Sequence, residues 1–288
     1  MKRILILLLA VTLIIGLCGC KETVHRPSVA ATTAPVYEFA SFLCQGTDIA
    51  VTRLITENVS CLHDYTLQVS QMKAMEYADL VILSGAGLEE FMDDVLVGKH
   101  IIDASSGIET ICSDHDHAHD HHHETDPHVW LAPKNAKIMA NNICRSLCEQ
   151  YPQYTEIITE NLQQLNDRFD ALQTYAEQAL ASLSSRQLLT FHDGFAYLAQ
   201  AFDLEILHAI EEESGREASA AELIGLCKLV QENSLAAIFT EQYGSTSAAS
   251  IISAETGAKI FQLDMAMGDC GYFDAMYHNI DTLKEALE

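Results

Sequence analysis

The sequence predicts an α/β protein with two lobes, each built on a mostly parallel sheet flanked by helices, and with one long α-helix that joins them. Short apolar runs alternate with amphipathic segments along the chain, which is the pattern of repeated strand–helix–strand units. A helical pattern without glycine or proline runs from residue 154 to residue 183. A helix of that length would reach about 45 Å, which is longer than one small domain is wide, so we expect it to link the lobes.

The N-terminal lobe is expected over residues 36–152. The apolar runs predict strands over residues 36–39, 49–52, 80–84 and 101–103. The amphipathic segments predict helices over residues 69–77, 88–95 and 133–151. Pro133 is typical of a first helical turn, because its missing N–H group would have no partner there.

The linking helix is assigned to residues 153–185 and the C-terminal lobe to residues 186–288. Strands are predicted over residues 188–191, 205–209, 236–240 and 259–262, and helices over residues 194–202, 218–231, 247–255 and 273–287. Ligands of open α/β sheets bind beyond the carboxyl ends of the strands. Polar residues that directly follow an apolar strand are therefore the first candidates for a site.

Residues 1–19 are typical of a signal peptide. Lys2 and Arg3 precede an uncharged apolar run that as a helix would reach only about 22 Å, too short to span a bilayer comfortably. The run ends in Leu-Cys-Gly-Cys, which resembles a bacterial lipobox, and cleavage before Cys20 would leave a diacylated cysteine that holds the protein on the membrane. Residues 20–35 would then be a lipid-anchored flexible tether. The alternative is an ordinary secreted protein or a single-helix anchor.

The composition excludes one class of partner and leaves another open. The chain carries 16 basic and 41 acidic residues, for a formal net charge of −25, and its only basic cluster is the Lys2-Arg3 pair. Such a chain would repel a phosphate backbone, so we expect no nucleic-acid binding. Cationic ligands remain possible.

The cysteines give no disulfide assignment. Nine are present, and seven remain once Cys18 and Cys20 are set aside with the signal peptide and the anchor. No CxxC spacing occurs, and Cys144 and Cys148 lie four residues apart on a predicted helix, where buried thiols are the simple explanation.

A histidine-rich segment lies within residues 113–125. Six of the chain's 13 histidines fall there: His115, His117, His119, His121, His122 and His123. Aspartate and glutamate residues are interleaved with them, and such a tract would capture divalent metals such as Zn²⁺. Because no fixed geometry is implied, we expect an auxiliary loop of low affinity. A solvated loop without a role is the alternative.

Isolated histidines and one carboxylate predict a tighter metal site. His63 lies in the loop after the second predicted strand, His128 follows Asp126-Pro127, and His192 and Asp264 each follow an apolar strand. A single histidine of this kind is often structural, and an aspartate here is often a helix cap. Three imidazoles with one carboxylate or water would give Zn²⁺ its preferred four ligands.

Four ordered motifs carry a resemblance to a known family. They are HDYTL at 63–67 continuing to GAGLE at 85–89, DPHVWL at 126–131, FHDGFAY at 191–197, and TE at 240–241 leading to ETG at 255–257. In this order they resemble the ZnuA-like zinc solute-binding proteins of bacterial ABC importers. The resemblance covers nearly the whole chain after the lipobox, and the acidic, histidine-rich loop is also similar to zinc members.

The resemblance implies two α/β lobes with a metal between them. It carries the ligand roles onto His63, His128 and His192. Asp264 takes the position of the family's C-terminal aspartate, although Met265-Ala266-Met267 replaces the usual proline-containing continuation. The fourth ligand is thus Asp264, water or Glu241, and Glu241 is otherwise expected to support the site from behind the ligands.

The expected function is extracytoplasmic capture of Zn²⁺, the transported ligand, and its delivery to a membrane permease with its ATPase. The protein would be no enzyme, and would act as a monomer anchored to the bacterial cell membrane. Manganese members of the family usually carry glutamate at the position of His192, so the resemblance favours zinc. The alternatives are a manganese or iron importer component, a surface zinc buffer or adhesin, and a zinc hydrolase. No HExxH motif is present for the hydrolase.

Overall fold

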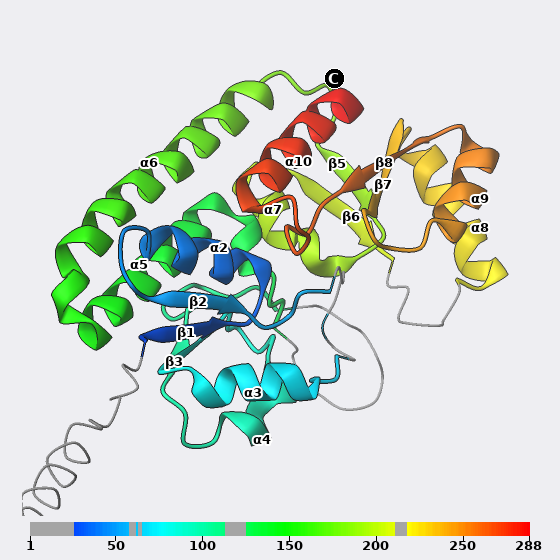
Figure 1. Ribbon diagram of the computed structural model, residues 1–288. Coiled ribbons are helices and arrows are strands. Elements are labelled where there is room, and N and C mark those ends of the chain that lie inside the picture. The colour runs from blue at the N-terminus through cyan, green and yellow to red at the C-terminus, as the bar shows by residue number, and fades with distance from the viewer. Residues whose placement is uncertain (1–25, 58–61, 63–64, 113–124, 211–217) are drawn as a thin grey trace, which may run out of the picture.

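The computed structural model describes residues 26–57, 62, 65–112, 125–210 and 218–288. Within them, two four-stranded parallel sheets form two lobes, and one long helix runs between the lobes (Figure 1). The predicted fold class is confirmed. The expected signal peptide, Cys20, His63 and the six clustered histidines lie outside the described residues.

The N-terminal sheet has the strand order β2-β1-β3-β4, with every neighbouring pair parallel. Its strands are β1 (Ser28–Ala31), β2 (Ala50–Arg53), β3 (Leu80–Leu83) and β4 (Ile101–Asp103). The helices of this lobe are α2 (Ala34–Leu43), α3 (Val69–Tyr77), α4 (Asp93–Leu96) and α5 (Pro133–Gln150), with 3-10 turns η1 (Glu90–Met92), η2 (Val129–Leu131) and η3 (Pro152–Tyr154). The central strand β1 is buried, which suits a parallel sheet covered on both faces.

The C-terminal sheet repeats the arrangement, with the order β6-β5-β7-β8. Its strands are β5 (Gln187–Thr190), β6 (Glu205–Ala209), β7 (Ala237–Glu241) and β8 (Lys259–Leu263). The surrounding elements are η4 (Asp193–Phe195), α7 (Ala196–Ala201), α8 (Ala220–Glu232), α9 (Ser247–Thr256) and α10 (Tyr272–Leu287). His192, Glu241 and Asp264 therefore all lie at the carboxyl edge of this sheet.

The start of the fold differs from the prediction. The strand expected over residues 36–39 is wrong, because this segment belongs to α2, and residues 28–31, expected in the flexible tether, form β1 instead. Val36, Phe39, Ala40 and Leu43 are all buried at the i, i+3, i+4, i+7 spacing of one helix face. Pro35 lies in the first turn, where its missing N–H group is tolerated.

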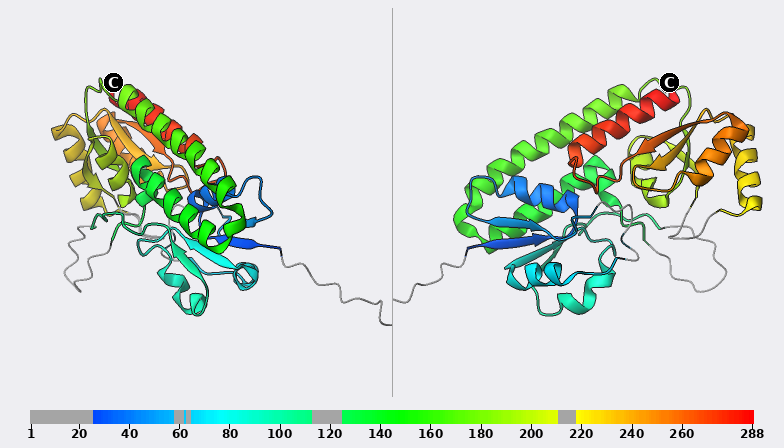
Figure 2. Two further views of the ribbon diagram at one scale, coloured as in Figure 1. Left: turned by 90° about the vertical axis from the view of Figure 1, so that its left-hand side faces the viewer. Right: turned by 45° about the vertical axis from the view of Figure 1, so that its right-hand side comes forward.

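The linking helix α6 (Thr155–Ala179) is 25 residues long and packs against both lobes. Its Phe169 ring lies 5.3 Å from the Phe39 ring of α2 and 5.1 Å from the Phe273 ring of α10, measured between ring centroids. Tyr272 completes this cluster at 5.0 Å from Phe39. Helix α10 consequently lies along α6 (Figure 2). Aromatic pairs add about 0.5–1.5 kcal/mol each beyond burial, so the cluster fixes one lobe against the other.

In the described segments, no helix combines the length and the apolar character required to cross a bilayer.

Glu89 is a buried carboxyl group at the carboxyl edge of the N-terminal sheet. Its carboxyl oxygens accept hydrogen bonds from the backbone N–H groups of Ser84 and Gly85, at 2.8 and 3.0 Å, and from the Thr32 hydroxyl at 2.6 Å. Burial outweighs these bonds and raises the pKa of Glu89 from 4.5 to about 7.

Glu89 should therefore make stability depend on pH. Between pH 4.5 and 7 the unfolded chain has released a proton that the folded chain keeps, so the contribution of this group falls as pH rises. We expect the difference in unfolding free energy between the wild type and Glu89→Gln to shift against the wild type from pH 5 to pH 8 in urea titrations. A difference that stays constant with pH would contradict the assignment.

Candidate metal centre

Two of the expected ligands, one from each lobe, lie side by side. His128 precedes η2 in the N-terminal lobe, and His192 follows β5 in the C-terminal lobe. Their ring centroids are 5.1 Å apart and the rings stand nearly perpendicular, at 83°. His128 is buried and His192 is half-buried. The lobe interface thus holds a pair of imidazoles that are close enough to share one ion.

Each of the two imidazoles is held by a carboxylate on the same ring nitrogen. Nδ1 of His128 lies 2.8 Å from Oδ1 of Asp126, and Nδ1 of His192 lies 3.1 Å from Oε1 of Glu241. A carboxylate at Nδ1 places the proton there and leaves Nε2 as the donor atom for a metal. Asp126 and Glu241 are themselves buried. A carboxylate on the second ring nitrogen is also the usual support of histidines that bind metals.

Asp126 was not among the predicted site residues. Its Oδ1 also accepts the backbone N–H of His128 at 2.9 Å, so it fixes the backbone as well as the ring. The available signal was an acidic residue two positions before a candidate ligand. Glu241 was expected near the site on the resemblance alone, and the structure places it against His192.

Gly194 is required for the close approach of the two histidines. A Cβ at this position would lie 2.6 Å from Nδ1 of His128, 2.7 Å from Cδ2 of His192 and 2.7 Å from Cε of Met265. All three distances are shorter than real contacts of a Cβ, so any side chain would push the ligands apart. This role is a matter of space and not of backbone angle.

The loop that carries His128 is also tied to the other lobe. The Tyr197 hydroxyl of α7 donates to the carbonyl of Asp126 and accepts the N–H of Ile111, both at 2.9 Å. The indole N–H of Trp130 donates to the carbonyl of Met265 at 2.8 Å, and the Tyr272 hydroxyl donates to the carbonyl of Trp130 at 2.9 Å. These bonds hold the histidine pair at the interface.

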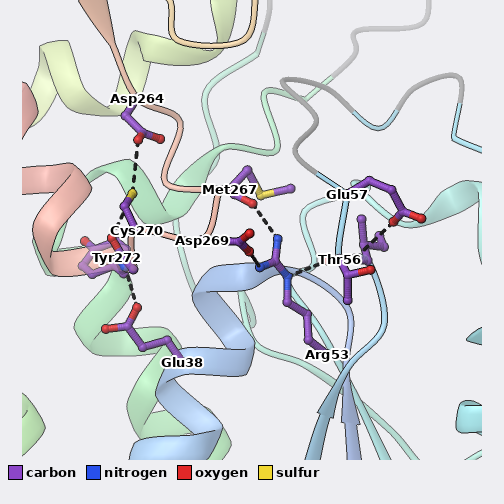
Figure 3. Close-up of polar contacts among 11 residues, drawn as sticks. Glu38, Arg53, Thr56, Glu57, Asp264, Met267, Asp269, Cys270 and Tyr272 are labelled. Carbon is purple, nitrogen blue, oxygen red and sulfur yellow. Dashed lines mark hydrogen bonds and ion pairs between the residues drawn. The ribbon is translucent and has the colours of Figure 1, made fainter.

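Asp264 is buried directly after β8, but its carboxylate contacts the loop that follows it. Oδ1 accepts the N–H of Ala266 at 2.7 Å, and the Cys270 thiol donates to Oδ2 at 3.4 Å (Figure 3). Asn279 bonds both the N–H and the carbonyl of Asp264 at 2.7 Å. In the part of the chain that the structure describes, no three histidine, cysteine or acidic side chains are grouped to hold a metal. Ligation by Asp264 therefore stays a prediction.

The histidine-rich loop departs from the fold next to this site. Cys112 and Thr125 form an antiparallel bridge at its two ends, and Asp126 follows directly. The loop residues themselves lie outside the described ranges. Metal binding by the six histidines therefore stays a prediction. Thr125, at the end of their loop, lies three residues before His128.

The fold is that of two-lobed solute-binding proteins, and the histidine pair lies where its two lobes meet. A family model described as "Zinc-uptake complex component A periplasmic" matches residues 29–286. The chain belongs to this family, whose members are the metal-binding components of ABC importers and act with a permease and an ATPase. The chain is therefore a metal-binding protein and no enzyme, which excludes the zinc hydrolase considered above.

Individual relatives agree with this assignment. The high-affinity zinc uptake system protein ZnuA of Bacillus subtilis is 26% identical over 310 residues, which cover 98% of this chain and 97% of that protein. The iron-binding protein YfeA of Yersinia pestis is 25% identical over 91% of this chain and 86% of its own length. The crystal structure of the metal-dependent lipoprotein YcdH from Bacillus subtilis superposes with a TM-score of 0.78 at 26% identity, covering 91% of this chain and 99% of that one.

Gly194→Ala should separate the two histidines. The added Cβ has no room between the rings, so we expect weaker metal binding and a loss of about 1–3 kcal/mol of stability, as for other overpacked sites. Thermal unfolding and metal titration would measure the two effects. Gly225→Ala in α8 is the matched control, since nothing lies within 4 Å of its Cβ, and it should leave binding unchanged. Equal behaviour of the two variants would refute the role.

Proposed function

We propose that the protein captures Zn²⁺ outside the cytoplasm and delivers it to the permease and ATPase of an ABC importer. The observation that carries this proposal is the pair His128 and His192, each with a buried carboxylate on Nδ1. Imidazole nitrogen suits Zn²⁺, whereas Mn²⁺ favours carboxylate and other oxygen ligands. The full ligand set would be His63, His128, His192 and Asp264.

The relatives differ in the metal for which they are named. The Bacillus subtilis relative is a zinc uptake protein, whereas the Yersinia pestis relative is named for iron. Zinc is favoured here by the donor atoms, because at least two of them would be imidazole nitrogens from the interface of the lobes. The manganese or iron importer component is the alternative, and a competition titration separates the two.

The outer parts of the chain complete the proposed picture. Cys20 would carry the lipid anchor that keeps the protein at the membrane, and the Bacillus subtilis structure is that of a lipoprotein. The histidine-rich loop, residues 113–125, would collect Zn²⁺ at low affinity beside the tight site. Its ends lie next to Asp126, so a metal released from the loop would be close to the histidine pair.

The purified chain should retain one tight zinc equivalent and prefer Zn²⁺ over Mn²⁺. His63→Ala, His128→Ala and His192→Ala should each remove that equivalent, because each imidazole would supply a donor atom. Deletion of residues 113–125 should leave it. Dialysis, metal analysis and competition titration at pH 7.5 would measure this. His208→Ala is the matched control, since His208 is an exposed histidine on β6.

Two outcomes would contradict the proposed site. Equal affinity for Mn²⁺ and Zn²⁺ would remove the zinc assignment, since the natural affinity order already favours zinc. Loss of the tight equivalent on deletion of the loop would reverse the roles given to the loop and to the histidine pair.

Cys20→Ala should release the protein from membranes. The proposed anchor is Cys20 at the processed N-terminus, modified with two acyl chains. Two chains are enough for stable attachment to a membrane. Fractionation of cells that express the wild type or the variant would measure the released share. Unchanged retention of the variant in the membrane fraction would contradict the assignment of Cys20 as the lipid anchor.

A further inference from the structure

Two side chains of the N-terminal lobe form hydrogen bonds with the loop that follows Asp264 and with the residue at its end. This loop, residues 265–271, connects β8 to α10 in the C-terminal lobe. Arg53, the last residue of β2, contacts its middle, and Glu38 of α2 contacts its end (Figure 3). The loop thus belongs to one lobe and is held by the other.

Arg53 makes three polar contacts with its guanidinium group. Nε donates to the carbonyl of Ile55 at 2.6 Å within its own lobe. Nη2 donates to the carbonyl of Met267 at 2.7 Å, and Nη1 bonds Oδ1 of Asp269 at 3.0 Å. The Arg53 side chain is 11% exposed and that of Asp269 is 76% exposed. Since exposed ion pairs contribute little, the bond to the buried side of the loop, at Met267, is the one that matters.

Glu38 holds the other end of the same loop. Its Oε2 accepts the N–H of Tyr272, the first residue of α10, where the helix dipole also favours a negative charge. A Cβ on Gly271 would lie 3.2 Å from this oxygen, and Gly271 has a φ of +89°. Glycine is therefore needed at this position for both the backbone angle and the approach of Glu38.

The held loop sets the direction of the Asp264 carboxylate. Both carboxylate oxygens are engaged by the loop, through the N–H of Ala266 and the thiol of Cys270. The next residue after Ala266 is Met267, whose carbonyl Arg53 binds. A movement of the loop at Met267 would therefore be transmitted to Oδ1 of Asp264 across one peptide unit.

We propose that Arg53 is a positioning residue for the metal site: by holding the loop of residues 265–271 from the opposite lobe, it sets the orientation in which Asp264 is available to the metal. The inference rests on the proposed zinc site. Arg53 is the last residue of β2, so its guanidinium group reaches the loop from the carboxyl edge of the N-terminal sheet.

A double-mutant cycle between Arg53 and Asp264 tests the inference. We expect Arg53→Gln to weaken zinc binding on the order of tenfold, the lower end of the range for residues that orient ligands. In an Asp264→Asn background the same substitution should have no further effect, because the group through which it acts is gone. Zinc dissociation constants from chelator competition, on the full soluble chain of residues 21–288, give the four values.

Two further variants test whether weaker zinc binding in Arg53→Gln comes from misfolding or from loss of the ion pair with Asp269. Arg53→Lys keeps the charge and one donor, so its zinc affinity should fall between those of the wild type and Arg53→Gln. Circular dichroism shows whether Arg53→Gln folds. If it folds poorly, Arg53→Lys still tests the positioning role. Asp269→Asn keeps the bond between Arg53 and Met267, so its affinity should stay within about twofold of the wild type.

The outcomes separate this inference from the proposed function. Wild-type affinity in Arg53→Gln, or the same weakening in both backgrounds, would overturn the positioning role while leaving zinc binding intact. A wild-type chain that retains no zinc would overturn the proposed function itself, and the role of Arg53 with it.

Discussion

The packing of both lobes against α6 is the constraint on which the candidate metal centre depends. His128 and His192 come from different lobes, so the distance between them is set by how the lobes are held and not by either sheet alone. Phe169 of α6 contacts α2 on one side and α10 on the other, which gives the two lobes a common apolar core. A loss of this packing would change the site without touching a ligand.

Two buried carboxylates would favour the binding of a cation at the proposed site. Asp126 and Glu241 are 3% and 4% exposed, and each contacts one imidazole. A neutral imidazole compensates a buried carboxylate only in part, so a nearby cation would lower the free energy of both. Oδ2 of Asp126 has no hydrogen-bond partner within the described residues, in keeping with this reading. Under the proposed function, a divalent ion bound beside the two imidazoles would offset part of the energetic cost of burying these carboxylates.

The sequence predicts the fold well where apolar runs mark buried strands. It predicts site residues only where they lie in a recognisable motif. The second to fourth strands of the N-terminal lobe and all four of the C-terminal lobe lie within a residue or so of their expected positions, because apolar runs mark buried strands. The first strand was missed, since Ser28–Ala31 is short and rich in alanine, with little β-branched character. Gly194 and Arg53 could not be predicted, because His128 and Met265, which crowd Gly194, and Met267, which Arg53 binds, lie far away in the chain.

Under the proposed function, the strongly acidic composition places metal selectivity at the buried histidine pair. A net charge of −25 attracts every cation near the surface, and the attraction depends on charge and hardly on the identity of the ion. Mg²⁺ and Ca²⁺, which prefer oxygen ligands, would be concentrated along with Zn²⁺. Among the residues that the structure describes, His128 and His192 at the interface offer imidazole nitrogens that are held in position by carboxylates on Nδ1. Under the proposed function, surface charge affects how fast metals arrive, whereas the lobe packing that sets the histidine pair decides which metal stays.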